Sequence, residues 1–318
     1  MVGGKLKLII DLLRIRQYYK NVLIFVGAFF AVAIFNFDVI FKLIWGFILL
    51  CCASSINYII NDIIDIEKDK LHEEKLKKKP LASGEISKAF AIFLVVILTG
   101  IILVSLISSI MFSVPNIYFM IMLLVFVITG QLYNHVFKDD AFIDIIVLSM
   151  LYLWRTLAGG IIIPVNISPW LALAIFELAM FLGIAKRKGD LLHLGEEKAI
   201  EHKKVYKEYS SSLLDQFQTM VATSVFMTYA LYLIISFNLF SPETVENPNI
   251  NHMIVFLTLP TLLYILMRYM YLTTKKPEIA RSTEKVFRDK GIMIAAVIFG
   301  GILVYIFYAQ TIINLLNF

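Results

Sequence analysis

The chain has 318 residues, of which 59% are hydrophobic and only 17% are charged, with a formal net charge of +5 and a mean hydropathy of +0.81. Soluble domains are nearer to half apolar and a quarter charged, so this composition excludes an ordinary soluble protein and indicates an integral membrane protein. Cys51 and Cys52 are adjacent in an apolar run and the five histidines are scattered, which disfavours a disulfide framework or a histidine-built metal site.

Residues 1–20 mix charged and apolar side chains and predict an interfacial amphipathic helix without a cleavable signal peptide. Nine apolar runs follow, and each predicts a helix that spans the bilayer. Their approximate bounds are 21–36, 40–66, 88–112, 116–135, 141–163, 169–187, 213–238, 252–273 and 291–313. The expected fold is therefore all-α, with one nine-helix membrane domain over residues 1–318.

The positions of lysine and arginine predict the orientation of these spans, because basic residues concentrate in cytoplasmic loops. Of the 29 lysines and arginines, all but Lys42, Arg155 and Arg268 lie in residues 1–20 or in every second connection after them. This pattern predicts a cytoplasmic amino terminus, an external carboxyl terminus and cytoplasmic loops at about 67–88, 188–212 and 274–290. We expect a multi-pass protein of the cell membrane.

Acidic residues collect where the second apolar run ends, in "NYIINDIIDIEKDK" from Asn57. At about 100° per residue, a helix would place Asp62, Asp65 and Asp69 within an arc of about 60°. Carboxylates on one face repel each other unless a cation lies among them, and hard oxygen ligands suit Mg²⁺ together with substrate phosphates. The lysines of "HEEKLKKKPLASG" follow directly, so the segment predicts a site for a metal-bound diphosphate at the cytoplasmic face.

A solvated, charge-balanced loop is the alternative interpretation of these charges. It explains the lysines, but it does not explain Asn57 and Asn61, which lie toward the apolar side where polar groups are costly.

"NDIIDIEKD" resembles the NDxxDxxxD motif of the UbiA superfamily of intramembrane prenyltransferases. Other segments resemble its decaprenyl-phosphate phosphoribosyltransferase branch, in order along nearly the whole chain. They are "LLRIRQYYKNVLIF", "YIIND", "KPLASG", "LYNHVFK", "LWRTLAGG", "KRKGDL", "YSSSLLDQ", "ALYLI", "RYMYL" and "RDK". The chain departs from the family at Lys79, where arginine is usual, and at Asp190, where glutamate is usual.

The resemblance implies nine helices around a cavity open to the cytoplasm, and a transferase that moves 5-phosphoribosyl from phosphoribosyl diphosphate to a polyprenyl phosphate. It implies Asn61 and Asp65 as Mg²⁺ ligands, with Asp62, Asp69 and Asp190 as catalytic residues. The donor-binding candidates that it implies are Lys20, Tyr58, Lys75 and Lys79. The candidates for binding the lipid phosphate are Lys138, Arg155, Lys186 and Arg187.

Several of these residues also have a structural interpretation. Lys20 is suited to anchoring the chain at the membrane surface, and Lys138 to marking a short cytoplasmic turn. Arg155 and Glu177 lie inside predicted spans, at about 21 Å and about 15 Å from the inner ends at 1.5 Å per residue. Arg155 therefore either pairs with Glu177 or contacts the lipid phosphate.

Two other functions stay open. One is a prenyltransferase that uses a polyprenyl diphosphate and an aromatic or other small acceptor. The other is a transporter, which the concentration of charge at one face disfavours. Nothing in the sequence indicates a nucleic-acid partner, and homo-oligomer formation is left open.

Overall fold

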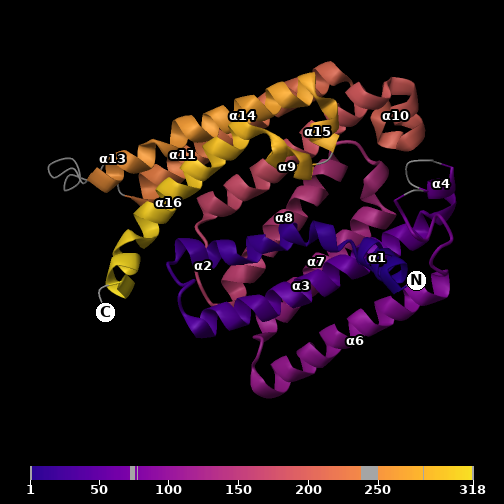
Figure 1. Cartoon of the computed structure of the whole chain (residues 1–318), viewed down its shortest axis with the longest axis horizontal. Helices are drawn as coiled ribbons and strands as arrows, with labels where there is room; N and C mark the ends of the chain where they lie inside the picture. The colour runs from indigo at the N-terminus through magenta and orange to yellow at the C-terminus, as the bar shows by residue number, and fades with distance from the viewer. Residues whose placement is uncertain (1, 72–75, 77, 238–249, 282, 317–318) are drawn as a thin grey trace. The chain divides into compact units, whose positions relative to one another are not determined.

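The computed structural model describes residues 2–71, 76, 78–237, 250–281 and 283–316 (Figure 1). Within these residues the regular structure is entirely helical. The chain forms two compact units, Met1–Lys138 with Met150–Ile167, and Asp139–Ser149 with Ser168–Phe318. The all-α expectation is confirmed for the described residues.

The first unit begins with α1 (Val2–Leu13), the 3-10 helix η1 (Ile15–Phe25) and α2 (Val26–Phe30). It continues with α3 (Phe37–Ile64), α4 (Ile66–Lys70), α6 (Lys88–Phe112) and α7 (Ile117–His135), and it includes the later part of α8 (Ile143–Ile162). A side-chain oxygen caps α3, α6 and α7 at their amino termini, from Asn36, Ser87 and Asn116 respectively.

The second unit contains the start of α8, then α9 (Pro169–Leu194), α10 (Glu196–His202), η3 (Lys204–Lys207) and α11 (Ser211–Ser236). After the gap follow α13 (Ile250–Phe256), α14 (Thr258–Lys275), α15 (Pro277–Arg281), η4 (Thr283–Arg288) and α16 (Lys290–Leu316). Its core includes Phe181, Leu214, Leu266 and Leu272, which are contributed by α9, α11 and α14.

Eight helices of the described chain are long and apolar enough to cross a membrane. They correspond to the predicted spans from 40–66 onward, with ends that differ by at most three residues, except that α9 continues to Leu194, seven residues beyond the predicted end at 187. The predicted first span, 21–36, is different: η1 covers its beginning and α2 ends at Phe30. Asn21 and Gly27 interrupt the run of large apolar side chains there, and the chain forms a 3-10 helix followed by five α-helical residues.

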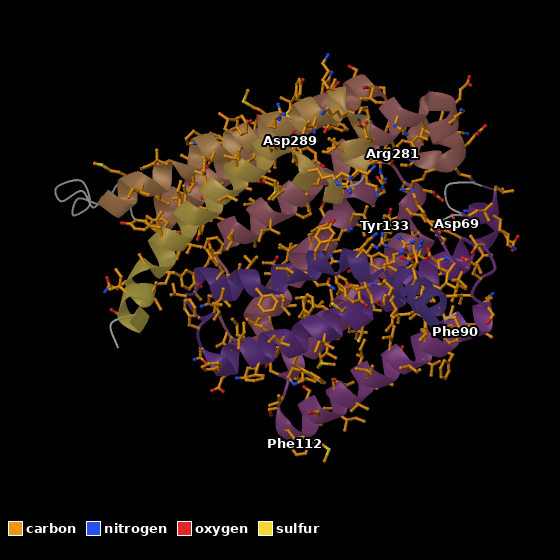
Figure 2. All side chains as sticks on the ribbon, in the orientation of Figure 1. Asp69, Phe90, Phe112, Tyr133, Arg281 and Asp289 are labelled. Atoms are coloured by element: carbon orange, nitrogen blue, oxygen red, sulfur yellow. The ribbon has the colours of Figure 1, made fainter. Side chains whose placement is uncertain are left out.

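The side chains of α6 show what these helices present to their surroundings. Phe90 and Phe112 mark its two ends in Figure 2, and Phe93, Val104 and Phe112 are 57%, 68% and 70% exposed. Such a continuous apolar surface would be unfavourable in water and is suited to lipid.

A close backbone approach joins η1 to α8. A Cβ atom added to Gly159 would lie 1.9 Å from the Ile24 carbonyl oxygen, so only glycine fits there. Asn21 is one turn before Ile24 and Arg155 is one turn before Gly159. The contact therefore brings the Asn21 and Arg155 side chains together inside the first unit.

Candidate functional site

The acidic motif of the first unit lies where α3 ends and the short helix α4 begins. Asp65 closes α3 with φ −92° and ψ 7°, and α4 begins at the next residue. The helical hydrogen bonds nevertheless continue, because Asp65 N donates to the Asn61 carbonyl over 3.0 Å and Asp69 N donates to the Asp65 carbonyl over 2.8 Å. Asn61 itself is half-buried.

Lys79 joins two of the motif carboxylates. Its ammonium nitrogen lies 2.8 Å from Asp62 Oδ1 and 2.5 Å from Asp69 Oδ2. Asp62 and Asp69 are 3% and 1% exposed, so these two acids converge on one cation in a buried position. The sequence favoured Asn61 and Asp65 as metal ligands, whereas the pair of carboxylates that converges here is Asp62 and Asp69.

Asp65 has a different partner. Lys138 Nζ donates to Asp65 Oδ1 over 2.7 Å, from the turn η2 (Phe137–Asp139) that follows α7. The structure thus brings Asp65 together with a lysine that the sequence singled out. Lys75, a predicted donor-binding residue, lies outside the described residues.

Arg14 also binds this acidic group, and sequence reasoning counted it only as a topological marker. It follows α1 in a left-handed conformation, with φ 54°. Its Nη2 donates to Asp62 Oδ1 over 2.7 Å, and its guanidinium lies 5.1 Å from the centre of the Tyr58 ring. Burial lowers the pKa of Arg14, but attraction to Asp62 and Tyr58 outweighs that effect and raises it, so the side chain stays charged.

Deeper in the first unit, polar side chains link the helices. Gln131 Nε2 donates to Asn57 Oδ1 over 2.5 Å, and Asn134 Nδ2 donates to the Asn57 carbonyl over 3.1 Å. Asn57 therefore connects α3 to α7, a structural role that the sequence pattern did not indicate. Tyr133, which belongs to the "LYNHVFK" segment, is half-buried near the end of α7 (Figure 2).

Arg155 is 4% exposed and lies within α8. Its Nε donates to Asn21 Oδ1 over 2.8 Å and its Nη1 to the Leu151 carbonyl over 2.7 Å. Glu177 belongs to the second unit, where its Oε1 accepts a hydrogen bond from Ser224 over 2.5 Å. The pairing of Arg155 with Glu177 stays a prediction.

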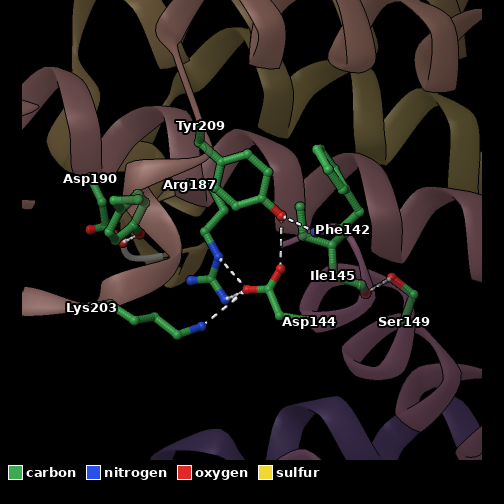
Figure 3. A network of polar contacts seen from close by, with 9 residues as sticks. Phe142, Asp144, Ile145, Ser149, Arg187, Asp190, Lys203 and Tyr209 are labelled. Atoms are coloured by element: carbon green, nitrogen blue, oxygen red, sulfur yellow. Dashed lines mark hydrogen bonds and ion pairs between the residues drawn. The ribbon is translucent and has the colours of Figure 1, made fainter. Parts of the chain in front are cut away.

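The second unit has its own network of charged side chains, centred on Asp144 (Figure 3). Arg187 Nε and Nη2 donate to Asp144 Oδ2 over 3.0 Å and 2.7 Å, and Lys203 Nζ lies 3.0 Å from the same oxygen. Tyr209 donates to the other oxygen over 2.8 Å. Asp144 is fully buried, so these donors surround a carboxylate that water does not reach.

Asp190 anchors a neighbouring group. It accepts a hydrogen bond from the Tyr206 hydroxyl over 2.6 Å and one from Arg281 Nε over 2.9 Å. The close approach of α9 to α15 requires a glycine at position 189. A Cβ atom added there would lie 2.9 Å from Ala280 Cβ and 2.9 Å from the Pro277 carbonyl oxygen of α15. The sequence gave no reason to single out this glycine or Arg281.

The phenols of this network remain protonated. Burial raises the pKa of the Tyr209 hydroxyl, and the adjacent Asp144 carboxylate raises it further. Burial also raises the pKa of Tyr206, an effect that Arg187 opposes and Asp190 reinforces. Both tyrosines can therefore donate to their aspartates at neutral pH. Lys188 is 3% exposed and pairs with Asp215 over 2.5 Å, while Lys186 is exposed on α9.

Within the part of the chain that the structure describes, no group of three or more His, Cys, Asp or Glu side chains is arranged to hold a metal ion. The Asp62–Lys79–Asp69 arrangement still fits a cation in one respect. The two carboxylates already share one positively charged atom, and their oxygens are the hard ligands that Mg²⁺ prefers.

These features define an all-helical, multi-pass membrane protein with charged groups gathered at helix ends. The model of the UbiA prenyltransferase family matches residues 22–287, and the chain belongs to that family. It is accordingly a membrane transferase.

Curated relatives include the decaprenyl-phosphate phosphoribosyltransferase of Mycobacterium tuberculosis, which is 30% identical over 236 residues, or 73% of this chain and 74% of the relative. The enzyme of the same name from Corynebacterium glutamicum is 29% identical over 229 residues, or 70% of this chain and 66% of the relative. A solved structure of a UbiA homolog from Archaeoglobus fulgidus bound to DMAPP and Mg²⁺ superposes with a TM-score of 0.63 at 16% identity. That superposition covers 92% of this chain and 98% of the homolog, and it supports the fold.

Proposed function

We propose that the protein transfers 5-phosphoribosyl from phosphoribosyl diphosphate to a polyprenyl phosphate and releases diphosphate. The observation that carries this proposal is the 30% identity, over 236 residues, with an enzyme named decaprenyl-phosphate phosphoribosyltransferase. In the reaction the bond from the anomeric carbon to the diphosphate oxygen breaks, and the diphosphate keeps the electron pair. A new bond forms from that carbon to an oxygen of the lipid phosphate.

The acceptor phosphate is anionic at neutral pH, so the reaction needs no strong general base. The chain has to bring two anionic substrates together and stabilise the charge that develops on the leaving group. A site with many cations suits that task, and Arg14, Lys79 and Lys138 supply them around the motif acids.

Asp62 and Asp69 would hold Mg²⁺, with Asn61 and Asp65 as the neighbouring candidate ligands. The metal, when bound, neutralises negative charge on the diphosphate. Lys79, whose ammonium lies against the same two carboxylates, would bind a phosphate oxygen of the donor. Lys20, Tyr58 and Lys75 are the other proposed donor-binding residues.

In the second unit, Asp190 is the proposed catalytic residue, and Lys186 and Arg187 are that unit's proposed lipid-phosphate candidates. Lys138 and Arg155 are the candidates of the first unit. The contacts of Arg187 and Asp190 also support a positioning role. They connect α9 to α8 through Asp144, to η3 through Tyr206 and to α15 through Arg281.

We further propose nine crossings, with η1 and α2 together forming the first. A 3-10 helix rises about 2.0 Å per residue and an α-helix about 1.5 Å. The 11 residues of η1 and five of α2 therefore reach about 30 Å, which is the thickness of the hydrocarbon core. Together with the lysine and arginine pattern, nine crossings support our proposal that the motif acids and the active site lie at the cytoplasmic face of the cell membrane.

A prenyltransferase is the second candidate function. The Archaeoglobus fulgidus homolog was solved with DMAPP and with GPP, each together with Mg²⁺, so a protein of this fold binds prenyl diphosphates. Its identity with this chain is 16%, about half that of the phosphoribosyltransferases.

Incubation of the purified protein with labelled phosphoribosyl diphosphate and a polyprenyl phosphate tests the proposal. We expect label in the lipid fraction, loss of product with EDTA, and recovery with added Mg²⁺. Replacement of Asp62 or Asp69 by asparagine should abolish product, whereas Asp38→Asn, at the other end of α3, should not. Turnover of a prenyl diphosphate with no lipid-linked phosphoribose would overturn the proposal.

A further inference from the structure

A groove of about 350 Å³ runs between α14 and α16, two helices of the second unit that lie side by side (Figure 1). Its walls include Pro260, Thr261 and Tyr264 of α14, and Ile294, Ala295 and Ile298 of α16. A volume of about 300–1,000 Å³ is typical of sites that bind small molecules. These six residues are not among those proposed for phosphoribosyl transfer, so that function leaves the groove without a role.

Each wall of the groove continues a stripe along one face of its helix, since residues four apart share a face. The stripes are Pro260, Tyr264 and Arg268 on α14, and Lys290, Ile294 and Ile298 on α16. Ile294 and Ile298 are 62% and 48% exposed, so the apolar part of the groove is open to its surroundings. Both stripes are therefore apolar toward one end and charged at the other.

The charged ends of the two stripes meet at Gly291. Arg268 Nε and Nη2 donate to the Oδ1 and Oδ2 atoms of Asp289, which is labelled in Figure 2, over 3.2 Å and 2.9 Å. A Cβ atom added to Gly291 would lie 2.6 Å from the Tyr264 hydroxyl oxygen and 3.4 Å from Arg268 Nε. The glycine thus allows a phenol hydroxyl and a guanidinium to gather at the start of α16.

This polar end carries more positive than negative charge. The Arg268 side chain is 36% exposed although Asp289 binds it, and a guanidinium has further N–H donors for a second anion. Arg288 and Lys290, which flank Asp289 in the sequence, are both exposed. Three cations with one carboxylate leave a positive balance, which is complementary to an anionic group bound at this end of the groove.

The length of the groove is close to the depth of one leaflet of a bilayer. From Lys290 to Ile298 the helix advances eight residues, or about 12 Å. The hydrocarbon core is about 30 Å thick, so one leaflet contributes about 15 Å. Because α16 begins at Lys290, the charged end lies where this helix enters the membrane, and the apolar walls run inward from it.

We propose that the groove binds an anionic glycerophospholipid of the surrounding bilayer. One acyl chain lies between α14 and α16, along Ile294 and Ile298. The headgroup phosphate accepts hydrogen bonds from Arg268 and the Tyr264 hydroxyl, and Lys290 adds positive charge beside it. A lipid bound in this way contacts both helices and stabilises their packing.

The first test compares two lipids that share their acyl chains and differ in headgroup charge. The purified full-length protein is delipidated in a neutral detergent and titrated with dioleoyl phosphatidylglycerol or dioleoyl phosphatidylcholine, and native mass spectrometry counts the bound lipids. We expect one phosphatidylglycerol to bind about tenfold more tightly than phosphatidylcholine, since each cation near a headgroup contributes to the affinity. The bound lipid should also raise the unfolding temperature.

Variants of the charged end test the headgroup contact. Lys290→Gln should weaken the binding of phosphatidylglycerol about fivefold, the usual effect of one cation at a lipid surface. Lys88→Gln, which removes an exposed cation at the start of α6, is the control and should leave the binding unchanged.

A variant of the apolar part tests the chain contact. Ala295 is 6% exposed, and Ala295→Phe places a large side chain in the groove, so the tight binding of phosphatidylglycerol should be lost. Ala296→Phe, at the exposed neighbour outside the groove, is the matched control and should bind normally. If Ala295→Phe does not fold, Ile298→Ala and Lys290→Gln decide, and each should weaken binding.

Equal affinity for the two lipids, or tight binding that survives in Ala295→Phe, overturns the proposal. Two other occupants would overturn it as well. Displacement of phosphatidylglycerol by a lower concentration of a polyprenyl phosphate would assign the groove to that lipid. A dimer that retains no lipid, and that Ala295→Phe dissociates, would assign the groove to a second copy of the chain.

Discussion

The Arg14 guanidinium lies 2.7 Å from Asp62 Oδ1, so the residue that follows the amino-terminal helix α1 is bonded directly to the first acid of the motif. Asp62 is 3% exposed and has Lys79 as its other cation. The helix that the sequence predicts at the membrane interface is thereby attached to the candidate active site.

Arg14→Gln should destabilise the first unit by about 1–3 kcal/mol, the usual effect of removing a partner from a buried charged group. Thermal unfolding of the detergent-solubilised protein measures this. Arg16→Gln is the matched control, because Arg16 is an exposed cation two residues away. Equal unfolding temperatures for the two variants would contradict the assignment.

Lys79→Met should have a larger effect, because it leaves Asp62 and Asp69 facing each other without their shared cation. Breaking a buried ion pair on one side costs about 3–5 kcal/mol, reduced here because the lysine side chain is 18% exposed. We expect lower stability and at least about a tenfold loss of transfer. Lys79→Arg keeps the charge and should retain most of the activity. Full activity in Lys79→Met would show that the ammonium does not serve the site.

The sequence predicted the helices well because their signals are local. Long apolar runs act on their own segments, so eight spans could be predicted, all but the end of α9 to within three residues. The caps Asn36, Ser87 and Asn116 also act locally, at the starts of α3, α6 and α7. The first span was predicted less accurately, because a 3-10 helix and an α-helix of similar composition differ in hydrogen-bond pattern and not in apolar content.

The partners of the charged residues could not be predicted, because they depend on contacts between distant segments. Asp62, Asp65 and Asp69 were recognised as a group, but their bonds to Arg14, Lys79 and Lys138 come from three other parts of the chain. Gly159 and Gly189 each permit a close backbone approach, but a glycine alone does not reveal which segment approaches it, so the sequence did not single them out.

Asp144→Asn should destabilise the second unit, because it leaves Arg187 and Lys203 buried or half-buried without their carboxylate. The expected decrease in the free energy of unfolding is about 3–5 kcal/mol. Asp139→Asn removes a nearby exposed carboxylate and serves as the control. A matching decrease in both variants would mean that the network in Figure 3 contributes no specific stability.

The pair between Arg268 and Asp289 predicts a dependence of stability on pH. The hydrogen bond from Arg268, over 2.9 Å, holds the pKa of Asp289 below its ordinary value. A carboxyl group whose pKa is lower in the folded than in the unfolded chain contributes stability above the unfolded value of about 3.9. That contribution is lost as the pH falls through the lower, folded value.

Asp289→Asn removes this ionisation, so the unfolding temperatures of the wild type and the variant should differ most at neutral pH. The difference should shrink as the pH is lowered below about 4, because the wild-type carboxyl group then becomes protonated as well. Thermal unfolding from about pH 7 to about pH 3 measures the trend. Glu278→Gln, at an exposed carboxylate of α15, corrects for general effects of charge removal. A difference that stays constant or grows in acid would show that the ion pair is not the cause.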